Sequence, residues 1–475
     1  MSRKQDPYKG QLGRYSTFYL VLIGAAIGFG NVWRFPYLTG ENGGGAFLLL
    51  YVICLFALGI PMMVAELVVG RVGKRNPVDS INVLCAKSGV TYWWQSIAWF
   101  AMAAGFIVLS FYSVVGGIAV AYIFYSAFGY FGATAESQMS FGVLNTNPGT
   151  LMGWHTLFLV IVMMVVKRGV RDGIGRAARM LMPLIVVIGF GLLIHAMDTV
   201  AFTDGFDYLF EFRPEQLSFS AILQALSHAF FSLTLSVGAM MALGAYMPDR
   251  MSAGRASAAV ALTDMFLALM AGLIILPLSL SHSALPQQGF GLMFQTLSTA
   301  FGEMAWGQFW GAAFYVLVTF AAWTSAIALA EPIVAWLIER ARLPRSIACL
   351  VLLIAAWFQG LVVIYSFNVW QSYQFAGLSL FGFFDFITSG LLIPLAGLLL
   401  VVFLGRRVKV AELESAAGFR HPEVFRLWYW NLRWLMPCFM YLVFILGLFN
   451  LLSSLCQGVS PESSGICVLI HYDIF

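Results

Sequence analysis

The sequence predicts an all-α integral membrane protein of eleven transmembrane helices, in which two sets of five helices form an inverted repeat and helices 1 and 6 are unwound. Three observations predict this fold: an apolar composition, basic residues confined to alternate loops, and two interrupted helices five spans apart. The 475 residues are 60% hydrophobic and 10% charged, with a mean hydropathy of +0.85, a balance that excludes a soluble globular protein.

Each predicted helix is an apolar run of about the length that crosses roughly 30 Å of hydrocarbon. The runs cover residues 15–38, 45–70, 93–128, 151–167, 177–197, 218–246, 256–281, 308–338, 344–366, 375–405 and 433–455. We expect residues 1–455 to form a single transmembrane domain, with repeat one at about 15–197, repeat two at about 218–405, an extra helix at 433–455 and a short extracytoplasmic tail at 456–475.

Lysine and arginine fix the expected orientation, because cytoplasmic loops carry the excess of basic residues. With the N-terminus in the cytoplasm, every one of the 26 basic residues except Arg34 and Arg213 falls in the N-terminal segment or in a cytoplasmic loop. An odd number of spans then places the C-terminus outside. The net charge of +4 is therefore a signal of topology and not of nucleic-acid binding.

The first span is interrupted in its middle. Gly24, Gly28 and Gly30 each weaken a helix by about 1 kcal/mol relative to alanine. Arg34 follows closely, and an arginine at membrane depth is costly unless it faces protein or water. A helix broken within the membrane exposes backbone carbonyls, which can hold an ion or a small ligand.

The sixth span contains a second interruption, the run Ser-Leu-Thr-Leu-Ser-Val-Gly at 232–238, which is rich in small and hydroxyl residues. Because the two interruptions lie five spans apart, the second five helices would be inverted relative to the first. Paired broken helices in corresponding positions indicate the midplane site of a secondary transporter, a rule drawn from folds of this kind.

The sequence lacks the motifs that would indicate ATP-driven transport or an enzyme. No Gly-x-x-x-x-Gly-Lys-Ser/Thr loop is present, which argues against transport driven by ATP. No nucleophile–base pair and no Cys/His cluster is visible, so an enzyme is the least favoured reading.

Several motifs resemble those of the neurotransmitter:sodium symporters, and among them the bacterial amino-acid transporters of the leucine-transporter fold. They are Gly-x-Gly-Asn-x-x-Arg-Phe-Pro at 28–36, Glu-Asn-Gly-Gly-Gly-Ala-Phe at 41–47, Gly-Ile-Pro-x-x-x-x-Glu at 59–66, Phe-Phe-Ser-Leu-Thr-Leu at 230–235 and Thr-Ser-Ala-Ile-Ala at 324–328. The resemblance implies a sodium-coupled symporter of a bacterial inner membrane that imports neutral hydrophobic L-amino acids by alternating access.

The resemblance also implies two sodium sites. The first would use the Ala26 carbonyl, the side chains of Asn31, Ser232 and Asp264, and the carboxylate of the substrate. The alternative for Asn31 and Ser232 is helix–helix hydrogen bonding. Asp264 is an acid in the middle of a span and would supply a fixed negative charge, so we expect chloride independence. Proton counter-transport through Asp264 stays open.

By the same resemblance, the second sodium site would use the carbonyls of Gly24, Ile27 and Ala321 with the hydroxyls of Thr324 and Ser325. The alternative is that these hydroxyls bond to the backbone of their own helix.

The substrate pocket would lie between the two interruptions, where half-helix ends favour a carboxylate. Tyr112 would donate a hydrogen bond to that carboxylate, and carbonyls at 231–234 would accept from the ammonium group. The residues assigned to this pocket are Ala26, Gly28, Gly30, Val108, Tyr112, Phe230, Phe231, Ser232, Thr234, Val237, Ala328 and Leu329. The set contains no acid, which favours a neutral amino acid over a cationic amine. Ala25 and Val237 stand where relatives often carry larger residues, so we expect room for bulky side chains.

Two gates complete the expected mechanism. Outside, Arg34 and Asp385 would form a breakable ion pair above a lid of Phe231 and Tyr112. Inside, Glu339 would meet a basic residue that precedes span one, either Lys9 or Arg14, and Tyr246 would cover this contact.

Two further polar residues within predicted spans have expected roles. Glu66 would hold the unwound part of span six. His228 would be either a packed side chain or a site of ion or proton chemistry.

Several alternatives stay open at this stage. Within transport, they are an amine or osmolyte as the substrate and a proton as the coupling ion. A membrane sensor that does not transport is a third alternative, although the expected ion ligands are all present. The sequence does not decide the preferred amino acid, the ion stoichiometry, the oligomeric state, or whether Cys456 and Cys467 form a disulfide.

Overall fold

The computed structural model describes residues 12, 15–131, 142, 144–281, 291–375 and 378–456. Its first half contains α1 (Tyr15–Ala26), the π-helical turn η1 (Gly30–Arg34), α2 (Phe35–Glu41), α3 (Gly45–Cys54), η2 (Leu55–Gly59), α4 (Ile60–Gly73), α5 (Pro77–Ser88), η3 (Tyr92–Gln95), α6 (Ser96–Ala127), α8 (Pro148–Lys167), η4 (Val170–Ile174), α9 (Gly175–Met197), α10 (Phe202–Phe210) and η5 (Pro214–Gln216).

The second half contains α11 (Phe219–Ser232), α12 (Ala239–Ala245), α13 (Ala253–Leu280), η6 (Leu292–Thr296), α14 (Leu297–Glu303), α15 (Gly307–Glu339), α16 (Arg345–Phe367), β1 (Gln374–Phe375), β2 (Leu378–Ser379), α17 (Leu380–Phe386), η7 (Ile387–Leu392), α18 (Ile393–Arg406), α19 (Val410–Ala417), α20 (Pro422–Trp430), η8 (Asn431–Leu435) and α21 (Met436–Cys456).

The predicted all-α membrane architecture is confirmed. Within the described part of the chain, nine helical segments are long and apolar enough to cross a membrane, and the bent pair Tyr15–Ala26 and Gly30–Glu41 makes a tenth candidate. The interrupted sixth span consists of 14 residues in α11 and seven in α12, and each of these helices alone is too short to cross a membrane. The count of eleven spans therefore stays a prediction.

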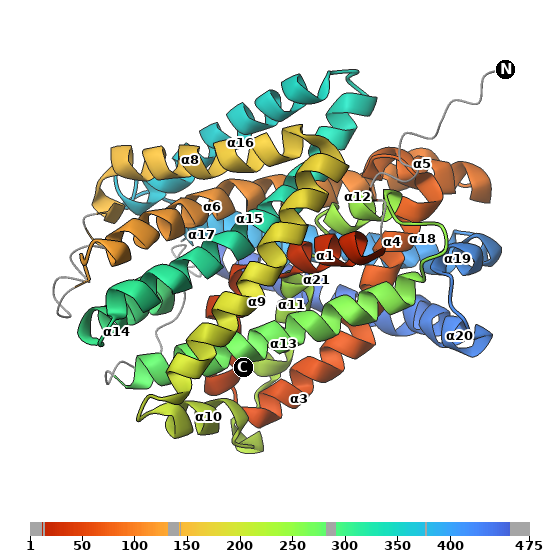
Figure 1. Cartoon of the computed structure of the whole chain (residues 1–475). Coiled ribbons are helices and arrows are strands. Elements are labelled where there is room, and N and C mark those ends of the chain that lie inside the picture. Colours follow the sequence, from red (N-terminus) through yellow and green to blue (C-terminus); the bar gives the residue numbers. More distant parts are fainter. Residues whose placement is uncertain are drawn as a thin grey trace.

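Long, deeply buried helices surround the interrupted ones. The windows within Tyr92–Ala127 and Gly307–Glu339 are 83% and 72% buried, and their helices α6 and α15 pack along each other. Figure 1 shows α1 and α11 near the centre, with α8 and α16 toward one side of the molecule and α3 and α13 toward the other. Because the interrupted helices are enclosed by protein, their unpaired backbone groups are kept away from lipid.

The sixth span is interrupted by backbone that no helix can contain. Thr234, Ser236 and Gly238 have φ angles of 54°, 60° and 82°, all in the left-handed region. The carboxylate of Glu66, fully buried on α4, accepts a hydrogen bond of 2.5 Å from the backbone N–H of Ser236. As expected from the sequence, Glu66 therefore contacts the unwound part of this span.

The glycine motif at 41–47 has a structural explanation that the sequence alone did not reveal. Gly43 and Gly44 have φ angles of 99° and 59°, and Gly44 forms an isolated β-bridge with Phe212 in the loop after α10. A Cβ atom on Gly43 or Gly44 would collide with the backbone carbonyls of Arg213 or Glu211, respectively. The glycines thus let the outer loop lie directly against the end of α2.

Side chains reinforce this contact. The Arg213 guanidinium donates to the carbonyls of Gly40 (3.3 Å) and Tyr208 (3.1 Å). The Tyr208 hydroxyl donates to Glu41 at 3.2 Å, and burial followed by the charge of Glu41 raises the pKa of Tyr208 to about 12. The hydroxyl therefore keeps its proton at neutral pH. Arg213, one of the two basic residues outside the predicted cytoplasmic pattern, joins α10 to α2.

Two local expectations need correction. The tenth span does not begin at 375, because Gln374–Phe375 and Leu378–Ser379 form the antiparallel pair β1–β2 and the helix starts at Leu380. The last helical segment begins at Pro422 instead of 433. Cys438 is exposed on α21. Lys9, Cys467 and the side chain of Cys456 lie outside the part of the chain that can be described.

We predict that Glu66→Ala lowers the free energy of unfolding by about 1–3 kcal/mol, because the buried N–H of Ser236 loses its acceptor. Thermal unfolding in detergent measures the change. Glu66→Gln is the matched control, since its amide oxygen can still accept this bond. Equal stability of Glu66→Ala and the unmodified protein would show that the carboxylate does not hold the interruption together.

Candidate functional site

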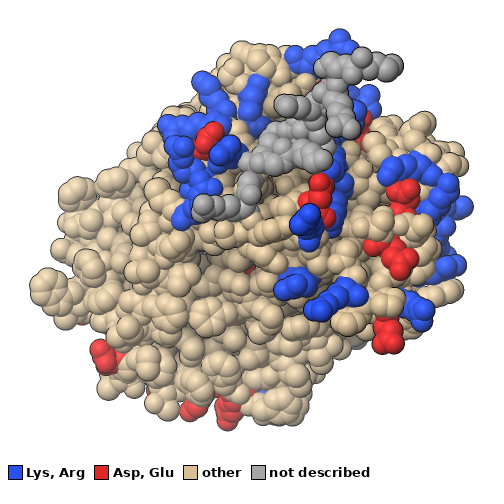
Figure 2. Space-filling view, turned by 45° about the vertical axis from the view of Figure 1, so that its right-hand side comes forward, with Lys and Arg blue, Asp and Glu red and all other residues tan. Residues whose placement is uncertain are grey.

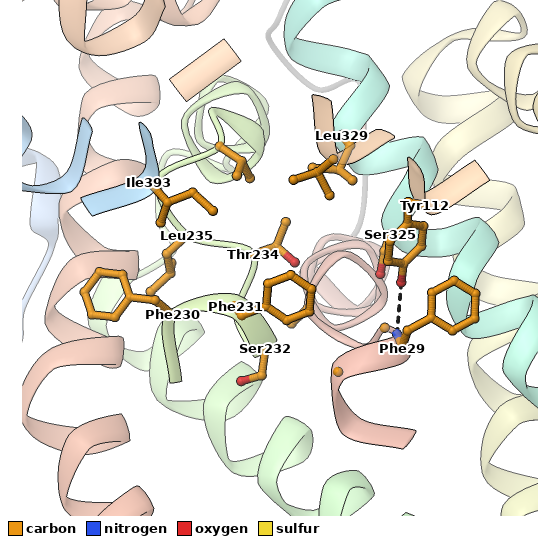
Figure 3. Close-up of a pocket in the computed structure, with 15 residues that line it drawn as sticks. Phe29, Tyr112, Phe230, Phe231, Ser232, Thr234, Leu235, Ser325, Leu329 and Ile393 are labelled. Atoms are coloured by element: carbon orange, nitrogen blue, oxygen red, sulfur yellow. Dashed lines mark hydrogen bonds between the residues drawn. The ribbon is translucent and has the colours of Figure 1, made fainter. Parts of the chain in front are cut away.

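A pocket of about 440 Å³, including the part open to solvent, lies between the two interruptions (Figure 3). Of the residues expected to surround a substrate, all line it except Ala328, which is buried elsewhere. The sequence did not point to four further lining residues, which are Phe29, Leu235, Ser325 and Ile393. None of the lining residues is charged. The pocket therefore offers apolar surface, hydroxyl groups and backbone, and no ionic partner for a side chain.

Tyr112 reaches across the pocket from α6 to the first interruption. Its hydroxyl accepts a 3.0 Å hydrogen bond from the backbone N–H of Phe29, a group that the broken helix leaves unpaired (Figure 3). A Cβ atom at Gly28 would lie 2.5 Å from this hydroxyl, and one at Gly30 would lie 2.9 Å from the Phe231 ring. Both glycines are thus needed for the two rings to approach the backbone this closely.

A cluster of buried oxygen and nitrogen atoms lies beside the pocket. The Asn31 amide donates to Asp264 at 2.6 Å. The Tyr51 hydroxyl donates to the other Asp264 oxygen at 3.4 Å and lies 3.3 Å from the Ser232 hydroxyl. The structure therefore brings together Asn31, Ser232 and Asp264 from three separate spans. Tyr51 on α3 is a member that sequence reasoning missed, because nothing in its own span singles it out.

The surroundings of the Asn31 side-chain oxygen indicate whether this cluster could bind a cation. This oxygen is buried, and no described residue donates a hydrogen bond to it. A buried acceptor without a donor is costly, whereas a hard cation such as sodium takes oxygen ligands of this kind. With the Asp264 carboxylate adjacent, the residues present fit a sodium ion at this place.

The groups of the expected second sodium site also converge. The Ser325 hydroxyl on α15 donates to the Ile27 carbonyl at 2.6 Å, bridging to the first interruption. The Thr324 hydroxyl donates to Ala321 in its own helix at 2.9 Å, the alternative that the sequence left open. Gly24 lies against Thr324, where an added Cβ would be 3.2 Å from the Thr324 Cβ. The structure therefore brings α1 against α15 at Gly24 and Thr324, and joins Ser325 to the Ile27 carbonyl.

At the outer gate, the structure shows Arg34 and Asp385 apart. No N–O distance of 4.0 Å or less joins these two described residues; the Arg34 guanidinium lies 5.6 Å from the centre of the Phe231 ring and donates to Ser227 at 3.5 Å. His228 packs below, with its ring 5.6 Å from Phe35 and 5.2 Å from Tyr51. This geometry agrees with the alternative in which His228 is a packed side chain.

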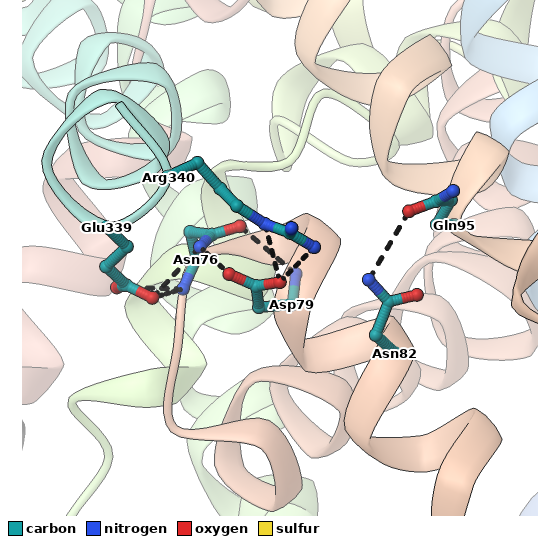
Figure 4. A network of polar contacts seen from close by, with 6 residues as sticks. All are labelled: Asn76, Asp79, Asn82, Gln95, Glu339 and Arg340. Atoms are coloured by element: carbon teal, nitrogen blue, oxygen red, sulfur yellow. Dashed lines mark hydrogen bonds and ion pairs between the residues drawn. The ribbon is translucent and has the colours of Figure 1, made fainter. Parts of the chain in front are cut away.

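At the inner gate, the described part of the chain gives Glu339 a partner that was not expected. Its carboxylate accepts from the backbone N–H of Asn76 at 3.1 Å and from the Asn76 side chain at 2.9 Å (Figure 4). The neighbouring Arg340 forms an ion pair with Asp79 at 2.7 Å. The end of α15 is thus bound to the start of α5. The expected partner Lys9, and its alternative Arg14, fall in residues that are not described.

Tyr246 has an acidic partner that the sequence did not indicate. Its hydroxyl donates to Glu331 at 2.7 Å, and Glu331 is fully buried and paired with Arg345. Sequence reasoning missed Glu331, although an acid within a span is itself a signal of a specific partner. The structure therefore links the end of α12 to α15 and α16 through this buried pair.

Comparison with known proteins identifies relatives over nearly the whole chain. The model of the sodium:neurotransmitter symporter family matches residues 9–131 and 130–463. The uncharacterized sodium-dependent transporter YhdH of Bacillus subtilis is 32% identical over 446 residues, covering 92% of this chain and 97% of that protein. An uncharacterized sodium-dependent transporter of Haemophilus influenzae is 27% identical over 442 residues, covering 91% and 97%.

Among solved structures, that of MhsT in complex with L-phenylalanine is similar to this one. The TM-score is 0.84 and the sequence identity 32%, and the match covers 91% of this chain and 98% of MhsT.

Proposed function

The chain belongs to the sodium:neurotransmitter symporter family, and from this premise we propose that it imports neutral hydrophobic L-amino acids with sodium, independently of chloride. As a member of this family it is a multi-pass, sodium-dependent membrane transporter and not an enzyme. The substrate class, the ion sites and the orientation are the parts that we propose. We assign it to a bacterial inner membrane, with the N-terminus in the cytoplasm and the C-terminus outside.

The observation that carries the substrate class is the absence of any charged side chain among the residues that line the described pocket. A free amino acid brings its own carboxylate and ammonium groups. Tyr112 and the backbone N–H groups at the first interruption suit the carboxylate, and carbonyls of the second suit the ammonium group. Only apolar surface then remains for the side chain. The bound L-phenylalanine in the related MhsT supports this assignment.

We propose two sodium ions, both held by the interruption of the first span. The first would bind Ala26, Asn31, Ser232, Asp264 and the substrate carboxylate. The second would bind Gly24, Ile27, Ala321, Thr324 and Ser325. Each ion would tie the interruption to a different helix, so substrate and sodium would stabilise the same arrangement. This shared dependence is the thermodynamic basis of coupled binding.

Asp264 carries the proposal of chloride independence. Two buried groups, Asn31 and Tyr51, donate hydrogen bonds to its carboxylate. A fixed negative charge so close to the first ion site would balance the cation without a mobile anion.

Alternating access would move the interrupted spans 1 and 6, with spans 2 and 7, against spans 3, 4, 8 and 9. On the outside, Arg34 and Asp385 would come together above Phe231 and Tyr112 when the pocket closes. On the inside, Glu339 would exchange partners, with Lys9 as the expected one. Tyr246 would act through Glu331 at the inner ends of the helices.

The proposed function predicts uptake of radiolabelled leucine or phenylalanine into proteoliposomes that contain the purified protein, driven by an inward sodium gradient. Equimolar external potassium should abolish uptake, because the ion sites would lack their cation. Replacing chloride by gluconate should leave uptake unchanged. Uptake that is equal in sodium and potassium would refute sodium coupling, and uptake of a cationic amine in preference to leucine would refute the substrate class.

For the first ion site, we predict that Asp264→Asn raises the sodium concentration for half-maximal uptake at least about tenfold, or makes uptake require chloride, because the fixed charge is lost. Uptake measured against sodium, with and without chloride, distinguishes these effects. Asp204→Asn, the same change at an exposed position on α10, is the control and should behave like the unmodified protein. Unchanged sodium and chloride dependence in Asp264→Asn would remove Asp264 from the site.

A further inference from the structure

The segment α20–η8–α21 is the membrane-spanning helix that is least covered by protein. Only 22% of its apolar window is buried, the lowest value among the described candidate spans. Large apolar side chains along it are exposed, namely Leu427, Trp430, Trp434 and Tyr441. Their spacing of three, four and seven residues places them along one side of the helix. This side therefore faces the bilayer.

Within this exposed side, two arginines lie close to one tryptophan. The guanidinium of Arg433, in η8, lies 5.7 Å from the Trp434 ring, and that of Arg406, at the end of α18, lies 5.8 Å from it. Close packing holds the two segments together. A Cβ atom on Gly405 would be 3.1 Å from the Arg433 Cα, and the Tyr429 hydroxyl donates to the Gly405 carbonyl at 3.0 Å.

Neither guanidinium has a counter-charge within the described part of the chain, because no carboxylate of a described residue lies within 4.0 Å of Arg406 or Arg433. A nearby acid on α19, Glu412, is instead paired with Lys87 at 2.8 Å. Two exposed cations thus lie near one tryptophan ring and next to apolar surface, with no acid among the described residues paired to them. This combination is complementary to a molecule with a phosphate group and an acyl chain.

The expected position of Arg406 and Arg433 at the membrane surface is consistent with binding of a lipid phosphate. Arg406 and Arg433 flank the basic loop that the sequence assigns to the cytoplasm, and Arg71 at the inner end of α4 donates to the Ala416 carbonyl in that loop at 2.9 Å. Figure 2 shows lysine and arginine gathered toward one end of the molecule, next to a broad uncharged surface. Basic residues at this boundary meet the anionic headgroups of the cytoplasmic leaflet.

We propose that Arg406, Arg433 and Trp434 form a binding site for an anionic phospholipid of the phosphatidylglycerol class. The two guanidinium groups bind the phosphate, the Trp434 ring holds both arginines in place, and an acyl chain covers the exposed side of α21. The site bridges α18 and η8 and does not include any residue of the proposed transport pathway.

Native mass spectrometry of the full-length protein in detergent tests the site by titration with phosphatidylglycerol and with phosphatidylcholine of identical acyl chains. We expect phosphatidylglycerol to bind in preference to phosphatidylcholine. The variant Arg406→Gln/Arg433→Gln should bind at least about five-fold less phosphatidylglycerol, since each arginine near the membrane surface contributes substantially to anionic lipid binding. Arg176→Gln/Arg255→Gln removes the same charge from exposed cytoplasmic positions and should keep the binding of the unmodified protein.

Further variants separate the contribution of charge from that of the aromatic ring and from loss of folding. Trp434→Leu retains both charges and an apolar side chain, and should weaken phosphatidylglycerol binding less than the loss of both arginines. Arg406→Lys/Arg433→Lys should retain most of the binding, and it carries the test if the glutamine variant does not fold. Equal binding of both lipids, undiminished binding in the glutamine variant, or equal loss in the Arg176/Arg255 control would overturn the proposal. Displacement by soluble glycerol phosphate at millimolar concentration would assign the site to a free phosphate instead of a lipid.

Discussion

The site depends on one physical constraint: a helix interrupted inside a membrane leaves backbone groups that neither lipid nor their own helix can satisfy. In this protein, side chains from other helices meet those groups. Tyr112 accepts from the N–H of Phe29, and Glu66 accepts from the N–H of Ser236. The hydroxyls of Thr234 and Ser325 donate to the carbonyls of Ala25 and Ile27. The interruptions and the helices around them are therefore parts of one site.

These contacts also explain why binding and conformation would be linked. The hydroxyl of Ser325 that now bonds to a carbonyl of the first span would instead share that carbonyl with a sodium ion. The side-chain oxygen of Asn31, which accepts no hydrogen bond from a described residue, would coordinate a sodium ion. Because each ion would replace or complete a contact between helices, filling the sites would change how firmly the interrupted spans are held. Glycines at 28 and 30 allow this by letting Tyr112 and Phe231 approach the backbone.

Much of this arrangement could be predicted from sequence because its causes are local. Apolar length indicates a span, glycines indicate an interruption, and an acid such as Asp264 within a span indicates a buried partner. The rest depends on which helix faces which. The contact of Glu339 with Asn76, the bond from Tyr246 to Glu331, and the position of Tyr51 beside Asp264 are set by helix packing. No periodicity within a single span contains that information.

The measurement that tests the central claim most directly is equilibrium binding of radiolabelled leucine and tryptophan to the purified protein, in sodium and in equimolar potassium, each with and without chloride. If the interruptions, Asp264 and sodium together form the amino-acid site, binding will occur in sodium only and will not respond to chloride. Binding of equal affinity in potassium would contradict the account, because the pocket would then form without the ion that is proposed to complete it.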